Sequence, residues 1–254
     1  MFKRIVFNKY FFILIFSLLI FMLNCAKKGP KEALEHFNQG LEHLNSSQYD
    51  LAIEEFREAI KIDPDFFEAR NNLGGALLRQ GMLDEAIVQF EKVIELDSTF
   101  LTAYHNLGGA YLEKRMPERA VEVLEEVLSK DPEYIEALIT LGRAYYRLEK
   151  ADQAMSAYRR ALTYDPDNIE ALRNLSFLYY EQGMYDLAVD ELNKTAKLVP
   201  NSAEPHAYLG LVYQKKGDRD KALEEFNRAL ELDPNNVVAR KELSDMRRSQ
   251  TEGN

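Results

Sequence analysis

The chain repeats itself with a period of 34 residues, and this period limits the folds that it can adopt. The copy at residues 135–168 reads IEALITLGRAYYRLEKADQAMSAYRRALTYDPDN. Steps of 34 from Ala154 always reach alanine, at Ala52, Ala86, Ala120, Ala188 and Ala222. Steps from Pro166 reach Pro64, Pro132, Pro200 and Pro234, and miss only at Ser98. Self-similarity at one fixed phase indicates stacked repeats rather than a single globular core.

Each copy is predicted to form two helices joined by a turn. In the first helix a leucine precedes a glycine, as in Leu141-Gly142, and one copy has Ser176 at the glycine position. We expect this glycine to let the recurring alanine of the second helix approach closely, because a larger side chain would overpack the crossing. Tyrosines recur three residues later and are predicted to fill the core.

The sequence also predicts the residues that form the turn between the two helices. Gly81, Gly183 and Gly217 fall where the first helix must end in a left-handed residue. Arg115 and Glu149 stand at the same position in two other copies, and we expect slightly looser turns there.

This unit resembles the tetratricopeptide repeat, a helix-turn-helix of 34 residues. The pattern covers residues 33–236 in six copies, at 33–66, 67–100, 101–134, 135–168, 169–202 and 203–236. The resemblance implies an all-α, right-handed superhelical solenoid. Residues 237–249 are predicted to form a C-terminal capping helix, and residues 250–254 a disordered tail.

The N-terminus is predicted to direct export. Basic residues precede the apolar run at residues 11–23, which is shorter than the roughly 20 residues of a membrane span, so residues 1–24 are predicted to be a signal peptide. The run ends in Met22-Leu23-Asn24-Cys25, which resembles the lipobox of bacterial lipoproteins. That resemblance implies lipidation of Cys25 and a tether at residues 25–32. An uncleaved anchor or a plain secreted form are the alternatives.

Charge and motifs exclude several functions. The formal net charge is −10, and residues 1–24 hold three basic residues and no acid, so the remainder carries −13 and nucleic acid is not an expected partner. We find no phosphate-binding glycine loop, zinc-ligand spacing or nucleophile motif. His36 and His43 occupy core offsets, so packing or cap polarity is expected rather than metal binding. The chain is therefore predicted not to be an enzyme and to need no cofactor.

The resemblance places the first helices along a concave groove that holds a peptide. One offset gives a row of amides, at Asn38, Asn72, Asn106 and Asn174. They could hydrogen-bond a peptide backbone, or they could be the structural habit of the family. Another offset gives Gly75 and Gly109, which predicts an open pocket in an apolar strip. That strip could instead pack partly against neighbouring helices.

Arginines and aromatics gather at the fourth and fifth copies. We expect Arg143, Arg147 and Arg173 to converge there and to bind a partner carboxylate, unless Glu170 and Glu181 pair with them. The candidate groove residues are Asn72, Asn106, Arg143, Tyr146, Arg147, Arg173, Asn174, Phe177 and Tyr180.

These features together predict a protein–protein adaptor anchored by lipid in the bacterial envelope. Ala26, which is not Asp, favours the outer membrane and the periplasmic side. The architecture also resembles the pilotin lipoproteins of type IV pilus biogenesis, which help assemble an outer-membrane secretin. Adaptors for peptidoglycan hydrolases share much of this plan. The expected partner is an envelope protein or a peptide segment of one, and no small-molecule cofactor is expected.

Overall fold

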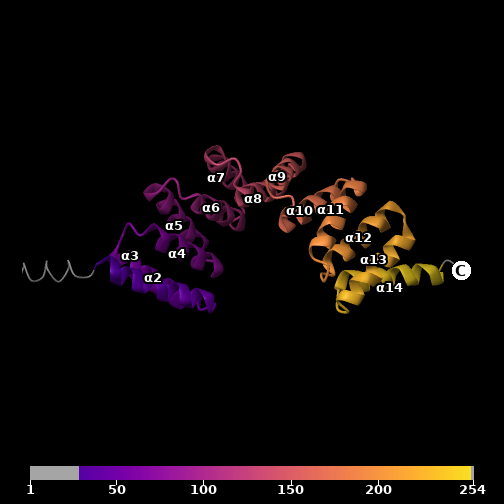
Figure 1. The fold of residues 1–254 in the computed structure, drawn as a ribbon, viewed down its shortest axis with the longest axis horizontal. Coiled ribbons are helices and arrows are strands. Elements are labelled where there is room, and N and C mark those ends of the chain that lie inside the picture. Colours follow the sequence, from indigo (N-terminus) through magenta and orange to yellow (C-terminus); the bar gives the residue numbers. More distant parts are fainter. Residues whose placement is uncertain (1–28, 253–254) are drawn as a thin grey trace, which may run out of the picture. The chain divides into compact units, whose positions relative to one another are not determined.

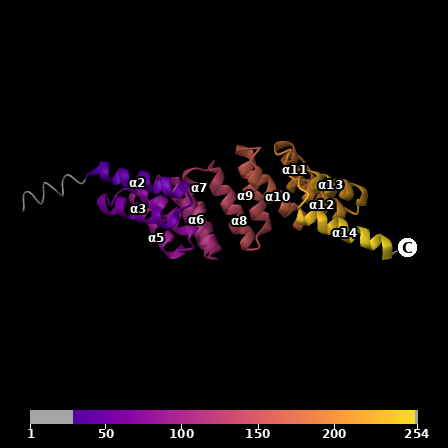
Figure 2. The ribbon, with the colours of Figure 1, turned by 90° about the horizontal axis from the view of Figure 1, so that it is seen from below.

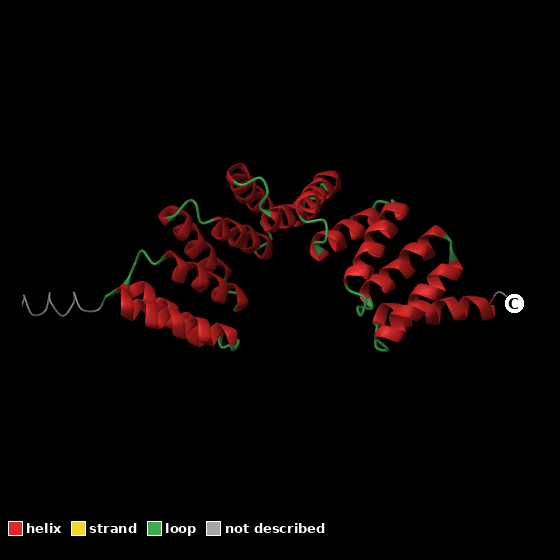
Figure 3. Cartoon of the chain, in the orientation of Figure 1, coloured by secondary structure: helices red, strands yellow, loops and turns green. Residues whose placement is uncertain are grey.

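The computed structural model describes residues 29–252, with side chains described for residues 29–248. Within these residues the chain consists of helices and short loops, without a strand (Figure 3). This confirms the prediction of an all-helical chain. The chain forms two compact units that separate after Arg115, so the boundary falls inside the predicted third copy.

Unit 1 is a series of helices that pack in chain order (Figure 1). They are α2 (Pro30–Asn45), α3 (Tyr49–Ile62), α4 (Phe67–Arg79), α5 (Leu83–Leu96) and α6 (Leu101–Glu113). Each packs on the next, and α4 also contacts both α2 and α6. Contact between near neighbours alone is the mark of a solenoid.

Unit 2 is built in the same way (Figure 2). Its helices are α7 (Pro117–Lys130), α8 (Ile135–Arg147), α9 (Ala151–Tyr164), α10 (Ile169–Glu181), α11 (Tyr185–Leu198), α12 (Glu204–Lys216), α13 (Arg219–Leu232) and α14 (Val237–Glu252). Successive helices pack on one another, and α12 also contacts α14. We call the side formed by α8, α10 and α12 the first-helix face.

The recurring alanines are buried, but they do not fill the space above the glycines. All six alanines are 0% exposed. A Cβ atom built on Gly40, Gly74, Gly142 or Gly210 would lie 2.5–2.6 Å from a ring carbon of Phe56, Phe90, Tyr158 or Phe226, respectively. Each ring belongs to the residue four positions after the alanine. The glycine therefore lets the second helix approach closely, as expected, and the group directly above it is an aromatic ring of that helix rather than the alanine.

The turns without glycine are as tight as those with it. Glu149 has φ 58° and Gly183 has φ 71°, so both are left-handed. The amide of Glu149 donates to the carbonyl of Tyr146 at 3.0 Å, and that of Gly183 to the carbonyl of Tyr180 at 3.1 Å. The expectation of looser turns is wrong, because the helix-ending hydrogen bonds force the same backbone on either residue.

Both ends of the described chain extend beyond the expected helices. Helix α2 begins at Pro30 inside the predicted tether, since proline suits the first turn of a helix. Helix α14 runs to Glu252, three residues past the predicted end, and buries Ala239, Leu243 and Met246 against a cluster that includes Phe226. Among the described residues, no helix has the length and apolarity to cross a membrane. The predicted signal peptide and Cys25 lie outside the described residues.

Candidate functional site

A cavity of about 300 Å³ opens between α10, α11 and α12 in unit 2. Its walls are aromatic, from Phe177, Tyr180 and Tyr208. Its remaining lining is Ser176, Leu192, Val212, Arg173, Asn174 and Glu204. This volume is at the lower end of the roughly 300–1,000 Å³ of small-molecule pockets, so the cavity fits a group of side-chain size.

The cavity lies where the repeat pattern changes at two facing positions. The glycine of the first helix is replaced by Ser176, and the ring of the second helix is replaced by Leu192. Both residues are buried, at 3% exposure each. The Ser176 hydroxyl donates to the carbonyl of Arg173 at 2.8 Å, so its polar group is satisfied within α10. Because no ring covers Ser176, space remains beside it.

A second cavity of about 150 Å³ adjoins the first and shares Arg173, Leu192, Glu204 and Tyr208 with it. It is lined by Val199, which replaces an aspartate of the repeat. Four of these aspartates accept a hydrogen bond from the backbone amide two residues later, namely Asp63, Asp97, Asp131 and Asp233. Valine cannot accept this bond. The loop that follows it is one residue longer, and α12 begins one residue later than the period predicts.

The rim of the cavity carries one ion pair. Arg173 Nη1 lies 3.6 Å from Glu204 Oε1, and each side chain is 48% exposed. Exposed pairs of this kind contribute about 0–1 kcal/mol, so this pair adds little stability, and its two charges compensate each other at the rim. The partner of Arg173 is neither Glu170 nor Glu181, the two acids that the sequence suggested.

A row of exposed aromatic side chains follows the first-helix face. Tyr146, Phe177 and Tyr208 come from α8, α10 and α12, and are 42%, 36% and 38% exposed. The rings of Tyr146 and Phe177 meet edge to face, with centroids 5.7 Å apart at 81°. The ring of Tyr180 lies 6.2 Å from that of Tyr185 on α11. Phe177 therefore connects the cavity to a wider aromatic surface.

The three arginines do not share one set of contacts. Arg143 and Arg147 are exposed on α8, whereas Arg173 is paired with α12. Burial raises the pKa of the Tyr158 phenol above its ordinary value, and the nearby charge of Arg143 opposes this rise. Glu170 on α10 also acts on this phenol, so Arg143 and Glu170 both lie near Tyr158. The convergence of the three arginines on one partner carboxylate stays a prediction.

The candidate residues of unit 1 lie in a different setting. The Asn72 amide donates to the carbonyl of Glu68 at 2.8 Å, and the Asn106 amide donates to Asn71 Oδ1 at 2.9 Å. These two side chains thus bond to their own unit. A Cβ atom at Gly75 or Gly109 would meet no atom within 4 Å, so there is open space above both glycines, while a pocket there stays a prediction.

The fold and the repeat pattern agree with a known family. Residues 31–254 match the family model described as the cilia and flagella-associated protein 70 C-terminal domain, whose label marks it as a tetratricopeptide repeat region. The chain belongs to this family. A search of curated proteins gave no match.

Solved tetratricopeptide structures are similar over most of the chain. YrrB, described as a protein with an unusual peptide-binding site, is 26% identical, with a TM-score of 0.60 over 74% of this chain and 97% of its own. PilF of Pseudomonas aeruginosa is 20% identical, with a TM-score of 0.71 over 85% and 99%. PilW, described as a type IV pilus biogenesis factor, is 17% identical, with a TM-score of 0.74 over 83% and 98%. The likeness to PilF and PilW is one of fold.

The tetratricopeptide tyrosines do more than fill the core. The hydroxyl of Tyr145 donates to Glu125 Oε1 on α7 at 2.5 Å, and that of Tyr179 accepts from Arg159 Nε on α9 at 2.9 Å. Each bond links a first helix to the second helix of the preceding repeat. Burial raises the pKa of Tyr145 to about 12, and the Glu125 carboxylate adds to the rise. The repeat pattern predicts the core position of these tyrosines, but not the hydrogen bonds of their hydroxyl groups.

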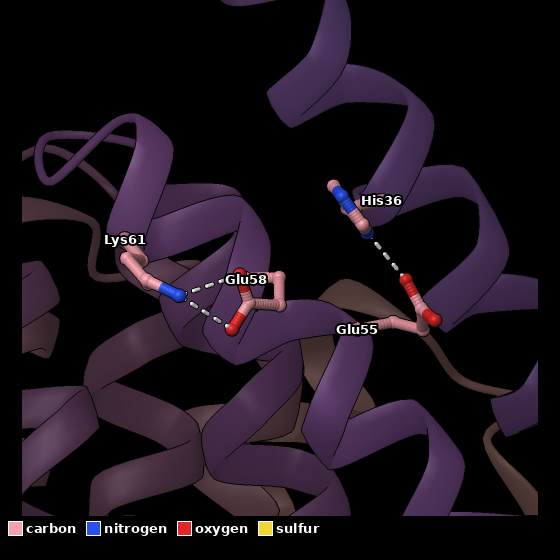
Figure 4. Close-up of polar contacts among 4 residues, drawn as sticks. All are labelled: His36, Glu55, Glu58 and Lys61. Carbon is pink, nitrogen blue, oxygen red and sulfur yellow. Dashed lines mark hydrogen bonds and ion pairs between the residues drawn. The ribbon is translucent and has the colours of Figure 1, made fainter. Parts of the chain in front are cut away.

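Two histidine–glutamate pairs were also missed. His36 Nδ1 lies 2.6 Å from Glu55 Oε2 (Figure 4), and His206 Nδ1 lies 2.7 Å from Glu225 Oε2. Figure 4 also shows Lys61 on Glu58, a pair within one helix. Each histidine joins the two helices of one repeat. Both members of the second pair lie at the same repeat positions as those of the first, so the period was the signal that could have found them.

The described residues offer little to a metal ion. Residues 29–248 contain no group of three or more His, Cys, Asp and Glu side chains placed to hold one. Each of the two pairs has one histidine and one glutamate, which is fewer than the ligands of a zinc site.

Proposed function

We propose that this tetratricopeptide scaffold binds a peptide segment of a partner protein on the first-helix face of unit 2. The observation that carries the proposal is the cavity between α10, α11 and α12, which continues into the exposed row Tyr146, Phe177 and Tyr208. A contiguous exposed aromatic surface is a candidate for protein binding, whereas single exposed apolar residues are not. The peptide-binding site described for YrrB adds support.

We test this with crosslinking in the native cells, using the full-length chain. Tyr180→Ala and Arg143→Glu are expected to reduce capture of a specific partner without loss of helicity. Tyr164→Ala is the matched control, because Tyr164 is 42% exposed on the second helix α9. Unchanged capture by both variants would place the binding surface elsewhere.

The second part of the proposal is the anchor. The lipobox-like sequence ending at Cys25 supports lipidation, which would hold the scaffold at the bacterial envelope, on the periplasmic side of the outer membrane. Labelled fatty acid is expected to enter the wild-type chain but not Cys25→Ala. A wild-type chain that takes up no label contradicts the anchor and leaves the peptide surface untouched.

A pilotin-like role is the second candidate. It is favoured by the signal sequence and Cys25 followed by repeats, while the likeness to PilF and PilW supports only the shared fold. Deletion is then expected to remove the multimers of an outer-membrane secretin. If the multimers persist, an adaptor for another envelope system, such as peptidoglycan hydrolases, is the better reading.

A further inference from the structure

We propose that the cavity at Ser176 and Leu192 is a socket for one uncharged aromatic side chain of the partner peptide. The inference rests on the proposed function, since it names what the peptide must present. It concerns the cavity lined by Phe177, Tyr180 and Tyr208.

The first argument is the ring that is absent from this repeat. In four repeats an aromatic ring covers the first-helix glycine so closely that an added Cβ would lie within 2.6 Å of it. Leu192 stands in the ring position of the fifth repeat, and Ser176 in its glycine position. The third copy also has a residue that is not aromatic at the ring position, Leu124, but it keeps glycine at the glycine position, Gly108. In the fifth repeat both positions differ from the pattern: Ser176 replaces the glycine and Leu192 replaces the ring.

The second argument is the lining. Three aromatic residues from two first helices surround the space, and Leu192 and Val212 complete its apolar surface. Aromatic rings favour edge-to-face and offset contacts with centroids about 4.5–7 Å apart. The Tyr146–Phe177 contact already has this geometry at the edge of the socket. An incoming ring would extend the same packing.

The third argument is charge. The Arg173 guanidinium and the Glu204 carboxylate at the rim pair with each other, so the rim has no net charge to offer. A charged side chain in the socket would lose its water without gaining an unpaired partner, which is unfavourable. The Ser176 hydroxyl is already bonded to the carbonyl of Arg173. An uncharged ring is therefore the best occupant.

The decisive variant fills the socket from within. Ser176→Gly with Leu192→Phe restores the glycine and ring pair that four other repeats contain. The variant should fold, because it follows the pattern of its neighbours. Ser176→Gly alone is the matched control, since it leaves the socket open.

A displayed library of random peptides serves as the probe, selected on the full-length chain in lipid nanodiscs. We expect the selected peptides to share one aromatic residue. Its replacement by alanine should weaken binding at least about tenfold, as for a buried anchor residue. The double variant should lose affinity to the same extent, and Ser176→Gly should bind as the wild type does.

The following results would overturn the socket or the proposed function. Selected peptides without a shared aromatic residue, or equal binding to the double variant, overturn the socket and leave the scaffold standing. A wild-type chain that selects no peptide overturns both the socket and the proposed function. If circular dichroism shows the double variant unfolded, Tyr208→Ala replaces it, because this exposed side chain forms one wall. Unchanged binding by Tyr208→Ala then overturns the socket.

Discussion

The helix pairs α8/α9 and α10/α11 have the same plan but different interiors. In α8/α9 the Tyr158 ring covers Gly142, and in α10/α11 Leu192 faces Ser176 beside a cavity. The backbone turns of the two pairs are alike. The comparison shows that a repeat can keep the same turn when its core ring is lost, and that in α10/α11 this loss leaves a cavity.

The largest expected difference is in the free energy of unfolding that is lost when the core side chain of each helix pair is truncated to alanine. Tyr158→Ala removes a ring that is 2% exposed, and should lower the free energy of unfolding by about 3–5 kcal/mol, as for other large aromatic residues. Leu192→Ala should cost less, about 2–3 kcal/mol, because fewer atoms are lost and a cavity already adjoins them. Urea unfolding followed by circular dichroism measures both. Equal costs would mean that the cavity does not loosen α10/α11.

The next difference is in the stability effect of placing alanine at the first-helix glycine position of each pair. A Cβ on Gly142 would lie 2.6 Å from the Tyr158 ring, so Gly142→Ala should cost roughly 1–2 kcal/mol after its gain in helix propensity. Ser176→Ala removes a hydroxyl that bonds within its own helix but gains helix propensity, so the two effects should offset to about 0.5 kcal/mol or less. Thermal unfolding of the two variants side by side tests the pairing. A neutral Gly142→Ala would show that the ring can move aside.

The sequence predicts the fold well because the fold is local. Every helix contacts near neighbours in the chain, so a 34-residue period that repeats Ala154 and its equivalents specifies the stacking as well as the helices. The ends are less well predicted. From the sequence, Pro30 is compatible with either a tether or the first turn of a helix, and the structure shows that it begins α2.

The candidate site is less predictable because it depends on deviations that act together. Ser176 is visible in the sequence as a small-residue variant, but the cavity also needs Leu192 from another helix. Arg173 pairs with Glu204, and Glu204 is the first residue of α12, which begins after the longer loop at Val199. Comparing the copies one repeat position at a time does not reveal a cavity that depends on substitutions at several positions together.

A difference of about 1 kcal/mol is expected from the tyrosine hydroxyls. Tyr145 donates to a carboxylate and Tyr179 accepts from a guanidinium, so replacing either by phenylalanine should cost about this much at pH 8. The pKa of Tyr145 is raised to about 12, so its protonated form is favoured by folding. Its contribution is present below about pH 10 and is lost as the pH rises through about 12.

The measurement compares wild type and Tyr145→Phe by urea unfolding at several pH values from 8 to 12. The gap between them should close as the pH approaches 12. Tyr164→Phe, an exposed residue on α9, is the control and should show no such gap. A gap that stays constant over this range would mean that the bond to Glu125 adds no stability that depends on the phenol proton.

The smallest expected difference is in the turns. Glu149 and Gly183 both hold a left-handed backbone, which costs a residue with a Cβ about 1–2 kcal/mol, while glycine loses more chain entropy on folding. Glu149→Gly should therefore stabilise the chain by about 0.5 kcal/mol, and Gly183→Glu should destabilise it by a similar amount. Thermal unfolding of the single variants and of the double exchange checks this, and the double should be close to wild type because the two single effects are opposite in sign and similar in size. If Glu149→Gly were destabilising, the Glu149 side chain would be making a contact that outweighs its backbone strain, and the two turns would be alike in conformation but not in the forces that hold them.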